Sequence, residues 1–189
     1  DSLYYDVFDY TRTYLAIGDF DDDEQSDIVL TRNNKYNSGK IEGGVWVWNP
    51  RNGQIVAKKS FEYFNSGQPS IGDVDGDCVP EIVFVTPDTL VVMKYDGSDE
   101  LKVLYKKKIF EITSGYTSNT LFDLNNDGKV EIIYRDERYL YILEGATGRE
   151  LSKMQMYHGT GFEMPIVADV DQDGQAEILV SGNLTDRDG

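Results

Sequence analysis

The chain has few of the residues on which several large protein classes depend. Its 189 residues include one cysteine, Cys78, so no internal disulfide can form. No run of about 18 apolar residues occurs, so the sequence predicts no membrane span. Lys and Arg number 18 against 34 Asp and Glu, for a formal net charge of −16. This balance argues against nucleic acid as a partner, because binding phosphates needs a basic face.

Signatures of common enzymes are also missing. No nucleophile elbow, phosphate-binding loop or zinc signature appears. The single histidine, His158, precedes a Gly-Thr-Gly segment and is a weak candidate for a general base, because it stands alone. We therefore predict no catalytic residue, although this does not decide whether the chain is part of an enzyme.

The residues that are abundant favour β-strands. Hydrophobic residues make up 40% of the chain and include 13 Tyr and 8 Phe among many β-branched side chains. No segment shows helical periodicity. The sequence therefore predicts an all-β globular protein.

One pattern recurs four times and organises the chain. The copies read IGDFDDDEQSDIVL, IGDVDGDCVPEIVF, LFDLNNDGKVEIIY and VADVDQDGQAEILV. Each combines an apolar strand, a loop with Asp or Asn at alternate positions, a closing Asp or Glu, and a second apolar strand. The first loop aspartates are Asp19, Asp73, Asp123 and Asp169, which lie 54, 50 and 46 residues apart. Such a period is typical of a repeat architecture.

Each repeat is predicted to form four short antiparallel strands within about 50 residues. Besides the short strands that lead into the second and third loops, the predicted strands are 14–17, 28–31, 44–48, 54–61, 81–86, 90–95, 101–109, 131–135, 139–144, 150–157, 165–168 and 177–180. The runs EIVFV and EIIY are apolar on both faces, so neighbouring sheets must cover both sides of those strands.

Four-stranded units arranged radially meet this need, and they form a β-propeller; a solenoid is the alternative. We expect residues 1–189 to form a single, partial propeller with blades at approximately 12–62, 68–110, 117–158 and 163–189. Three blades and half of a fourth do not close a ring. The rest of the propeller must then come from the same, longer chain or from a partner chain.

The loops have the composition of calcium sites. Fifteen of the 34 carboxylates lie in them, and four divalent ions would halve the formal net charge. Hard oxygen ligands without His or thiolate suit calcium better than magnesium. Numbered from its first Asp, each loop offers ligands at positions 1, 3, 5 and 9. These are Asp19, Asp21, Asp23 and Asp27; Asp73, Asp75, Asp77 and Glu81; Asp123, Asn125, Asp127 and Glu131; and Asp169, Asp171, Asp173 and Glu177.

The loops are not EF-hands. An EF-hand needs a bidentate Glu at position 12 and flanking helices. Position 12 is apolar in every copy (Leu30, Phe84, Tyr134 and Val180), and the flanking segments are predicted strands.

The motif DxDxDGxxE followed by an apolar strand resembles the FG-GAP/VCBS repeat of integrin-α-type β-propellers. The resemblance covers almost the whole chain and is strongest in the third and fourth copies, where Gly128 and Gly174 occupy position 6. Glu24 and Cys78 occupy that position in the first two copies, and the Phe-Gly and Gly-Ala-Pro words of the family name are missing. The resemblance implies seven or eight blades, with a calcium loop joining the first two strands of each.

We expect up to four calcium ions in a structural role, and an extracellular or cell-surface module for adhesion, ligand recognition or scaffolding, with a protein or glycan as ligand. Rigid, low-affinity calcium loops suit the cell exterior. The alternative is a carbohydrate-active enzyme similar to polysaccharide lyases built on calcium-rich propellers. A third possibility is a spacer that has no ligand of its own.

Two further features have alternative explanations. Trp46 and Trp48 point to one face of a strand, where packing between blades is favoured over stacking on sugar rings. Three successive lysines at 106–108 lie in a predicted outer strand, where they favour a solvated edge that blocks strand pairing.

Overall fold

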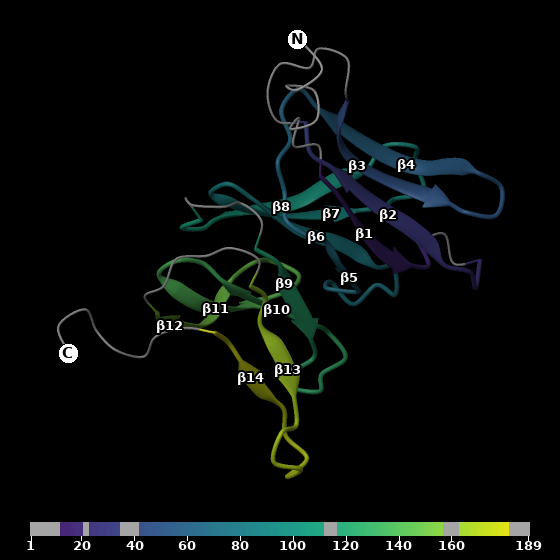
Figure 1. Ribbon diagram of the computed structural model, residues 1–189. Helices are drawn as coiled ribbons and strands as arrows, with labels where there is room; N and C mark the ends of the chain where they lie inside the picture. The colour runs from purple at the N-terminus through teal and green to yellow at the C-terminus, as the bar shows by residue number, and fades with distance from the viewer. Residues whose placement is uncertain (1–11, 21–22, 35–41, 112–116, 157–162, 182–189) are drawn as a thin grey trace.

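The described residues form four successive antiparallel sheets and contain no helix (Figure 1). This computed structural model describes residues 12–20, 23–34, 42–111, 117–156 and 163–181. The first sheet contains β1 (Thr13–Gly18), β2 (Asp27–Arg32), β3 (Gly43–Asn49) and β4 (Gln54–Phe61). The second contains β5 (Ser70–Gly72), β6 (Glu81–Thr86), β7 (Thr89–Lys94) and β8 (Lys102–Lys108). The third contains β9 (Asn119–Phe122), β10 (Glu131–Arg135), β11 (Tyr139–Glu144) and β12 (Glu150–Gln155). The fourth contains β13 (Ile166–Ala168) and β14 (Glu177–Leu179).

The predicted strands are confirmed, with small shifts at their ends. The predictions 54–61, 81–86, 131–135 and 139–144 coincide with β4, β6, β10 and β11. The prediction 150–157 extends beyond β12, and Tyr157 lies outside the described residues, as does His158. Strand order follows chain order in each sheet, so short turns suffice to connect neighbouring strands.

The core lies between the sheets, and β6 shows why its sequence is apolar throughout. Ile82 and Phe84 belong to the cluster shared with the first sheet, whereas Val83 and Val85 belong to the cluster shared with the third. Successive side chains of a strand point to opposite faces, so both faces of β6 are covered. In the same way, Ile133 of β10 packs toward the fourth sheet.

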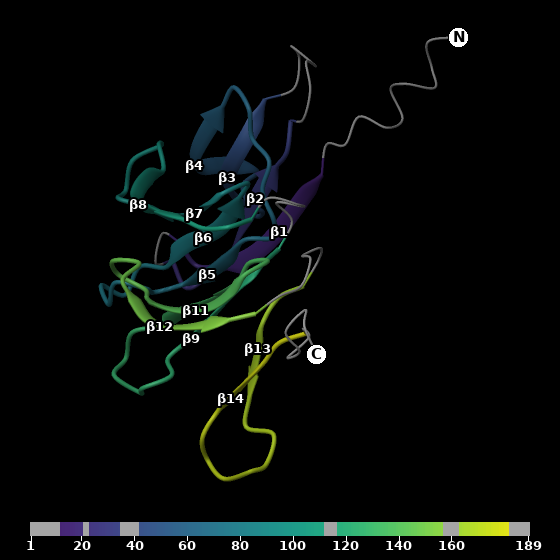
Figure 2. The same ribbon diagram turned by 90° about the vertical axis from the view of Figure 1, so that its left-hand side faces the viewer.

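The sheets are arranged in a propeller-like way. Their first strands lie next to one another, since β5 contacts both β1 and β9, and β9 contacts β13. Figure 2 shows the four sheets following one another from β1–β4 to the β13–β14 hairpin. The fold is therefore all-β and propeller-like.

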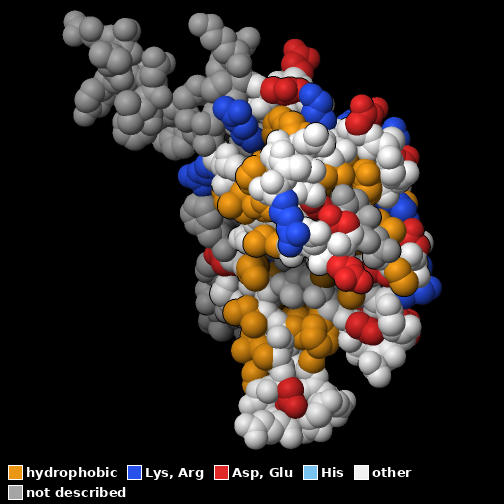
Figure 3. Space-filling model, turned by 90° about the vertical axis from the view of Figure 1, so that its right-hand side faces the viewer, with side chains coloured by type: hydrophobic (Ala, Val, Ile, Leu, Met, Phe, Trp, Pro, Cys, Tyr) orange, Lys and Arg blue, Asp and Glu red, His pale blue; other side chains and the backbone are white. Residues whose placement is uncertain are grey.

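One face of the first sheet is apolar and is not covered by another of the described sheets. Val45 and Val47 of β3 point into the core, and the half-buried Trp46 and Trp48 therefore point to the opposite face. There they pair in register with the apolar Leu30 and Ile28. The side chain of Ile17, on the same face, is 68% exposed. In Figure 3, hydrophobic side chains (orange) gather on the face turned to the viewer, and they continue down to the hairpin at the lower end of the molecule.

The three lysines lie where the sequence predicts, on the outer edge strand β8. Lys107 forms an ion pair with Glu150 of the third sheet at 3.1 Å, and Lys108 with Asp88 at 2.6 Å. An edge lined with charge discourages pairing with another strand.

Among the described residues, no helix has the length and apolar character that a bilayer crossing requires.

Candidate metal centre

Each Asp-rich loop joins the first two strands of its sheet and is closed by one repeated hydrogen bond. The residue at position 9 begins the second strand, and its carboxylate accepts a hydrogen bond from the backbone N–H at position 2. The pairs are Phe20 N with Asp27 Oδ2 (3.2 Å), Val74 N with Glu81 Oε2 (2.9 Å), Leu124 N with Glu131 Oε2 (2.8 Å) and Val170 N with Glu177 Oε2 (2.9 Å). One carboxylate oxygen of each position-9 residue is thus used by the loop backbone, and in the second loop the other, Glu81 Oε1, accepts no hydrogen bond.

The first aspartate of each loop orders the turn. Its Oδ1 accepts a hydrogen bond from the N–H at position 5, in the pairs Asp19–Asp23 (3.3 Å), Asp73–Asp77 (3.1 Å), Asp123–Asp127 (3.1 Å) and Asp169–Asp173 (3.1 Å). Its Oδ2 accepts one from the N–H at position 6 in the last three loops, from Cys78 (2.8 Å), Gly128 (2.8 Å) and Gly174 (2.9 Å). The second, third and fourth loops, which differ in sequence, therefore share one backbone arrangement, and the described residues of the first loop share the hydrogen bond to position 5.

This arrangement requires left-handed backbone at two positions. Position 6 has positive φ in all four loops: Glu24 (62°), Cys78 (69°), Gly128 (86°) and Gly174 (88°). The turn expected from the glycines thus also forms where the family glycine is replaced. Position 4 is left-handed in the three loops where it is described: Gly76 (81°), Asn126 (57°) and Gln172 (63°). The sequence analysis did not single out position 4, although Gly and Asn are the residues that tolerate this conformation best.

The structure brings carboxylates together in the second and fourth loops. Oxygens of Asp73, Asp75 and Glu81 lie within 4.8 Å of one another, and those of Asp169, Asp171 and Glu177 do the same. In the first loop, Asp21 lies outside the described residues. The fourth-loop aspartates are exposed and Glu177 is half-buried.

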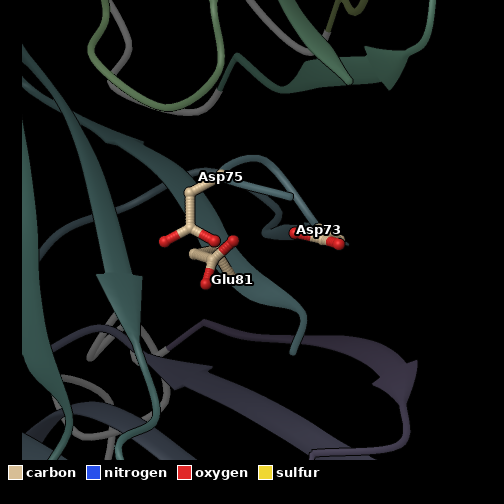
Figure 4. Close-up of side chains that lie close together, drawn as sticks. All are labelled: Asp73, Asp75 and Glu81. Atoms are coloured by element: carbon tan, nitrogen blue, oxygen red, sulfur yellow. The ribbon is translucent and has the colours of Figure 1, made fainter. Parts of the chain in front are cut away.

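The second loop contains a cationic side chain that the sequence analysis missed. Lys94, the last residue of β7, places Nζ 2.7 Å from Asp75 Oδ2, 2.5 Å from Asp77 Oδ2 and 3.8 Å from Glu81 Oε1. The carboxylates of Asp75 and Glu81 adjoin, with Asp73 to one side (Figure 4). Glu81 is fully buried, and its Oε1, like Asp75 Oδ1, has no hydrogen-bond partner. Both oxygens could serve a cation.

In the third loop an amide occupies the middle of the ligand set. Asn125 Nδ2 donates to Asp127 Oδ2 at 3.1 Å and to Glu131 Oε1 at 3.4 Å, while its Oδ1 accepts a hydrogen bond from Asp127 N at 2.9 Å. A neutral amide reduces the negative charge of this ligand set by one relative to that of the fourth loop.

Burial and charge shift the pKa values of the loop carboxyls in opposite directions. Desolvation raises the pKa of Glu81 to about 7, the nearby charge of Asp75 adding to a shift that the hydrogen bond from Val74 opposes. Desolvation also raises the pKa of Glu131. The hydrogen bond from Lys94 lowers the pKa of Asp77. A cation near Glu81 would stabilise the ionised form of this carboxyl, so a bound cation would offset the cost of burying its charge.

The sequence could have indicated that Lys94 lies near the second loop only if the pairing register of β6 and β7 had been predicted. Ile82 pairs with Met93, so Glu81 and Lys94 lie opposite each other at the ends of β6 and β7. The loop motif itself contains neither β7 nor its register.

Comparison with known proteins agrees with this geometry. No curated protein matches the chain. A crystal structure of the V. cholerae biofilm matrix protein Bap1 is similar over 94% of this chain, with a TM-score of 0.51 and 15% identity. The chain spans 32% of that protein's length. The model of the FG-GAP-like repeat matches residues 73–134 and 123–180, which together cover more than half of the sequence. The chain therefore belongs to the family of FG-GAP-like repeat proteins.

Proposed function

We propose that this chain is part of a calcium-binding β-propeller that acts outside the cell in adhesion, ligand recognition or scaffolding. The observation that carries the calcium assignment is the convergence of Asp169, Asp171 and Glu177, with ligand oxygens within 4.8 Å, in a loop whose backbone is repeated along the chain. Carboxylate oxygens alone form this ligand set, and calcium prefers such ligands.

The role proposed for calcium is structural. In the sequence, the candidate ligands at positions 1, 3 and 5, Asp19, Asp21 and Asp23 and their equivalents, fall between the first two strands of a sheet, and the ligand at position 9, Asp27 or its equivalent, begins the second strand. An ion there would hold the two strands together and neutralise carboxylates that repel one another. A ligand that binds only the native state stabilises it by about 2.7 kcal/mol at 100 times its Kd.

The proposal includes completion of the propeller by further sheets. The apolar face that carries Trp46 and Trp48 needs a cover, as does the hairpin of β13 and β14, where Ile166 and Val170 are each 56% exposed. We assign the blades to 12–62, 68–110, 117–158 and 163–189, with the remaining blades supplied by more of the same chain or by a partner chain.

The extracellular role is supported by two observations. The similar structure belongs to a protein named for a biofilm matrix, and rigid loops with exposed aspartates suit the calcium concentrations outside cells. A protein or a glycan is the partner expected of such a module.

The first test measures calcium binding and thermal unfolding of the same protein. We expect calcium to bind and the melting temperature to fall when a chelator removes it. An unchanged melting temperature together with no bound calcium would contradict the assignment. Binding to glycan arrays and to matrix proteins then tests the adhesive role, whereas release of unsaturated sugars from acidic polysaccharides would favour a lyase.

A further inference from the structure

Lys94 lies where a metal ion would be expected in the second loop. Its Nζ contacts Asp75 Oδ2 and Asp77 Oδ2 at 2.7 and 2.5 Å, and the nearest oxygen of Glu81 is 3.8 Å away. These three residues occupy ligand positions 3, 5 and 9. We propose that Lys94 is the resident cation of the second loop, so that this loop keeps its turn without calcium at concentrations that fill the fourth loop.

The residue that faces position 9 differs from sheet to sheet. In the first sheet it is Asn49, whose Oδ1 accepts hydrogen bonds from Arg51 N and Asn52 N in its own turn. In the third sheet it is Glu144, which pairs across from Glu131 but forms an ion pair with Arg149 at 2.8 Å. Neither side chain is directed by these contacts into its loop. Only the lysine of the second sheet, among these three, supplies a positive charge to the ligand positions.

The fourth loop provides the contrast. Its carboxylates converge like those of the second loop, but among the described residues no lysine or arginine forms an ion pair with them. Electrostatic attraction for a divalent ion is therefore greater there, since no ammonium group competes.

Lysine satisfies the second loop only in part. Asp75 Oδ1 and Glu81 Oε1 remain without hydrogen-bond partners, because one ammonium group cannot reach every ligand oxygen. For calcium to bind, the ammonium must leave two carboxylates, and its charge must be moved away from the ion. Lysine therefore weakens calcium binding without removing the ligands, and loss of lysine should restore a site.

This inference rests on the proposed calcium function and is tested by measuring bound calcium in the full chain and in Lys94→Met. At a free calcium concentration that saturates the wild type's tightest site, we expect each Lys94→Met chain to bind about one calcium more than the wild type. The affinity of the second loop for calcium should be at least roughly tenfold higher in the variant than in the wild type. Without calcium the variant should melt at a lower temperature than the wild type, and calcium should raise its melting temperature more.

Lys107→Met is the matched control, because it removes the same charge from an ion pair with Glu150 outside the loops. It should bind as much calcium as the wild type. If Lys94→Met folds only with calcium present, this supports the inference, and Lys94→Gln then allows the titration in a more stable background.

The failures are distinguishable. Equal calcium content and affinity in the wild type and Lys94→Met, with binding clearly measurable, would overturn the role of Lys94 alone. No calcium bound by either protein would overturn both this role and the proposed function. Calcium bound by the variant but not by the wild type would support the role of Lys94.

Discussion

The backbone N–H of Cys78 donates a hydrogen bond to Asp73 Oδ2 at 2.8 Å while Cys78 itself has a φ of 69°. The loop therefore forces a residue with a Cβ atom into left-handed backbone, where the third and fourth loops have glycine. The thiol is exposed, so packing does not compensate for this conformation.

We predict that Cys78→Gly raises the free energy of unfolding by about 1 kcal/mol, because glycine adopts this conformation without the steric cost of a Cβ atom. Urea unfolding in metal-free buffer measures the change. The converse control is Gly128→Ala at the equivalent position, where an added Cβ meets no atom within 4 Å. It should lower stability by roughly 1 kcal/mol through backbone strain alone. Equal stability of Cys78→Gly and the wild type would show that the loop tolerates cysteine without strain.

Asp171→Asn should reduce the calcium-dependent rise in melting temperature. Asp171 is one of the three carboxylates that converge in the fourth loop, and an amide oxygen is a weaker ligand than a carboxylate. Differential scanning fluorimetry over a calcium titration measures the effect. Asp99→Asn, at an exposed acid outside the four loops, makes the same change in net charge and should leave the titration unaltered.

Burial of Glu81 predicts a pH dependence in the metal-free protein. Because folding raises the pKa of this carboxyl to about 7, the folded state holds its proton more tightly than the unfolded state does. Its contribution to stability is complete below about pH 4.5 and is lost as the pH rises through about 7, for a total of about 3 kcal/mol.

Glu81→Gln resembles the protonated form and should remove this part of the dependence. In metal-free buffer the variant should be more stable than the wild type at about pH 7.5, and the difference should shrink toward about pH 5. Urea unfolding across this range gives both curves. A difference that grows as the pH falls would contradict the buried, proton-binding state of Glu81.

The interface between the first two sheets depends on Phe84. This side chain is fully buried and meets the Phe64 ring edge-on, with 5.5 Å between ring centroids. Phe84→Ala should lower the free energy of unfolding by about 3–5 kcal/mol, because it leaves a cavity in the core. Phe122→Ala, whose side chain is 38% exposed, is the control and should cost much less. Chemical denaturation of both variants tests the contrast.

The sequence predicts the strands well because the pattern of each strand is local. Val83 and Phe84 are adjacent and both apolar, and that alone indicates that the strand that contains them has two covered faces. The loops are predictable for the same reason, since their alternating acids lie within nine residues. Glu81 and Lys94 meet through the pairing of two strands, and Gln172 is left-handed although glutamine does not favour that backbone. Contacts that depend on register, and conformations imposed by neighbouring hydrogen bonds, are not encoded in a local pattern.

β6 contributes alternate side chains to two hydrophobic clusters, one shared with the first sheet and one shared with the third. The second sheet therefore has no hydrophobic core that is separate from those of its neighbours. The stability of such a protein is carried by the junctions between neighbours. A cut or an insertion through the middle of a sheet would damage two junctions at once. Gain or loss of one complete repeat, from one Asp-rich loop to the next, would instead keep each remaining sheet packed against a neighbouring sheet. Evolution and engineering can therefore change the length of this array in whole repeats.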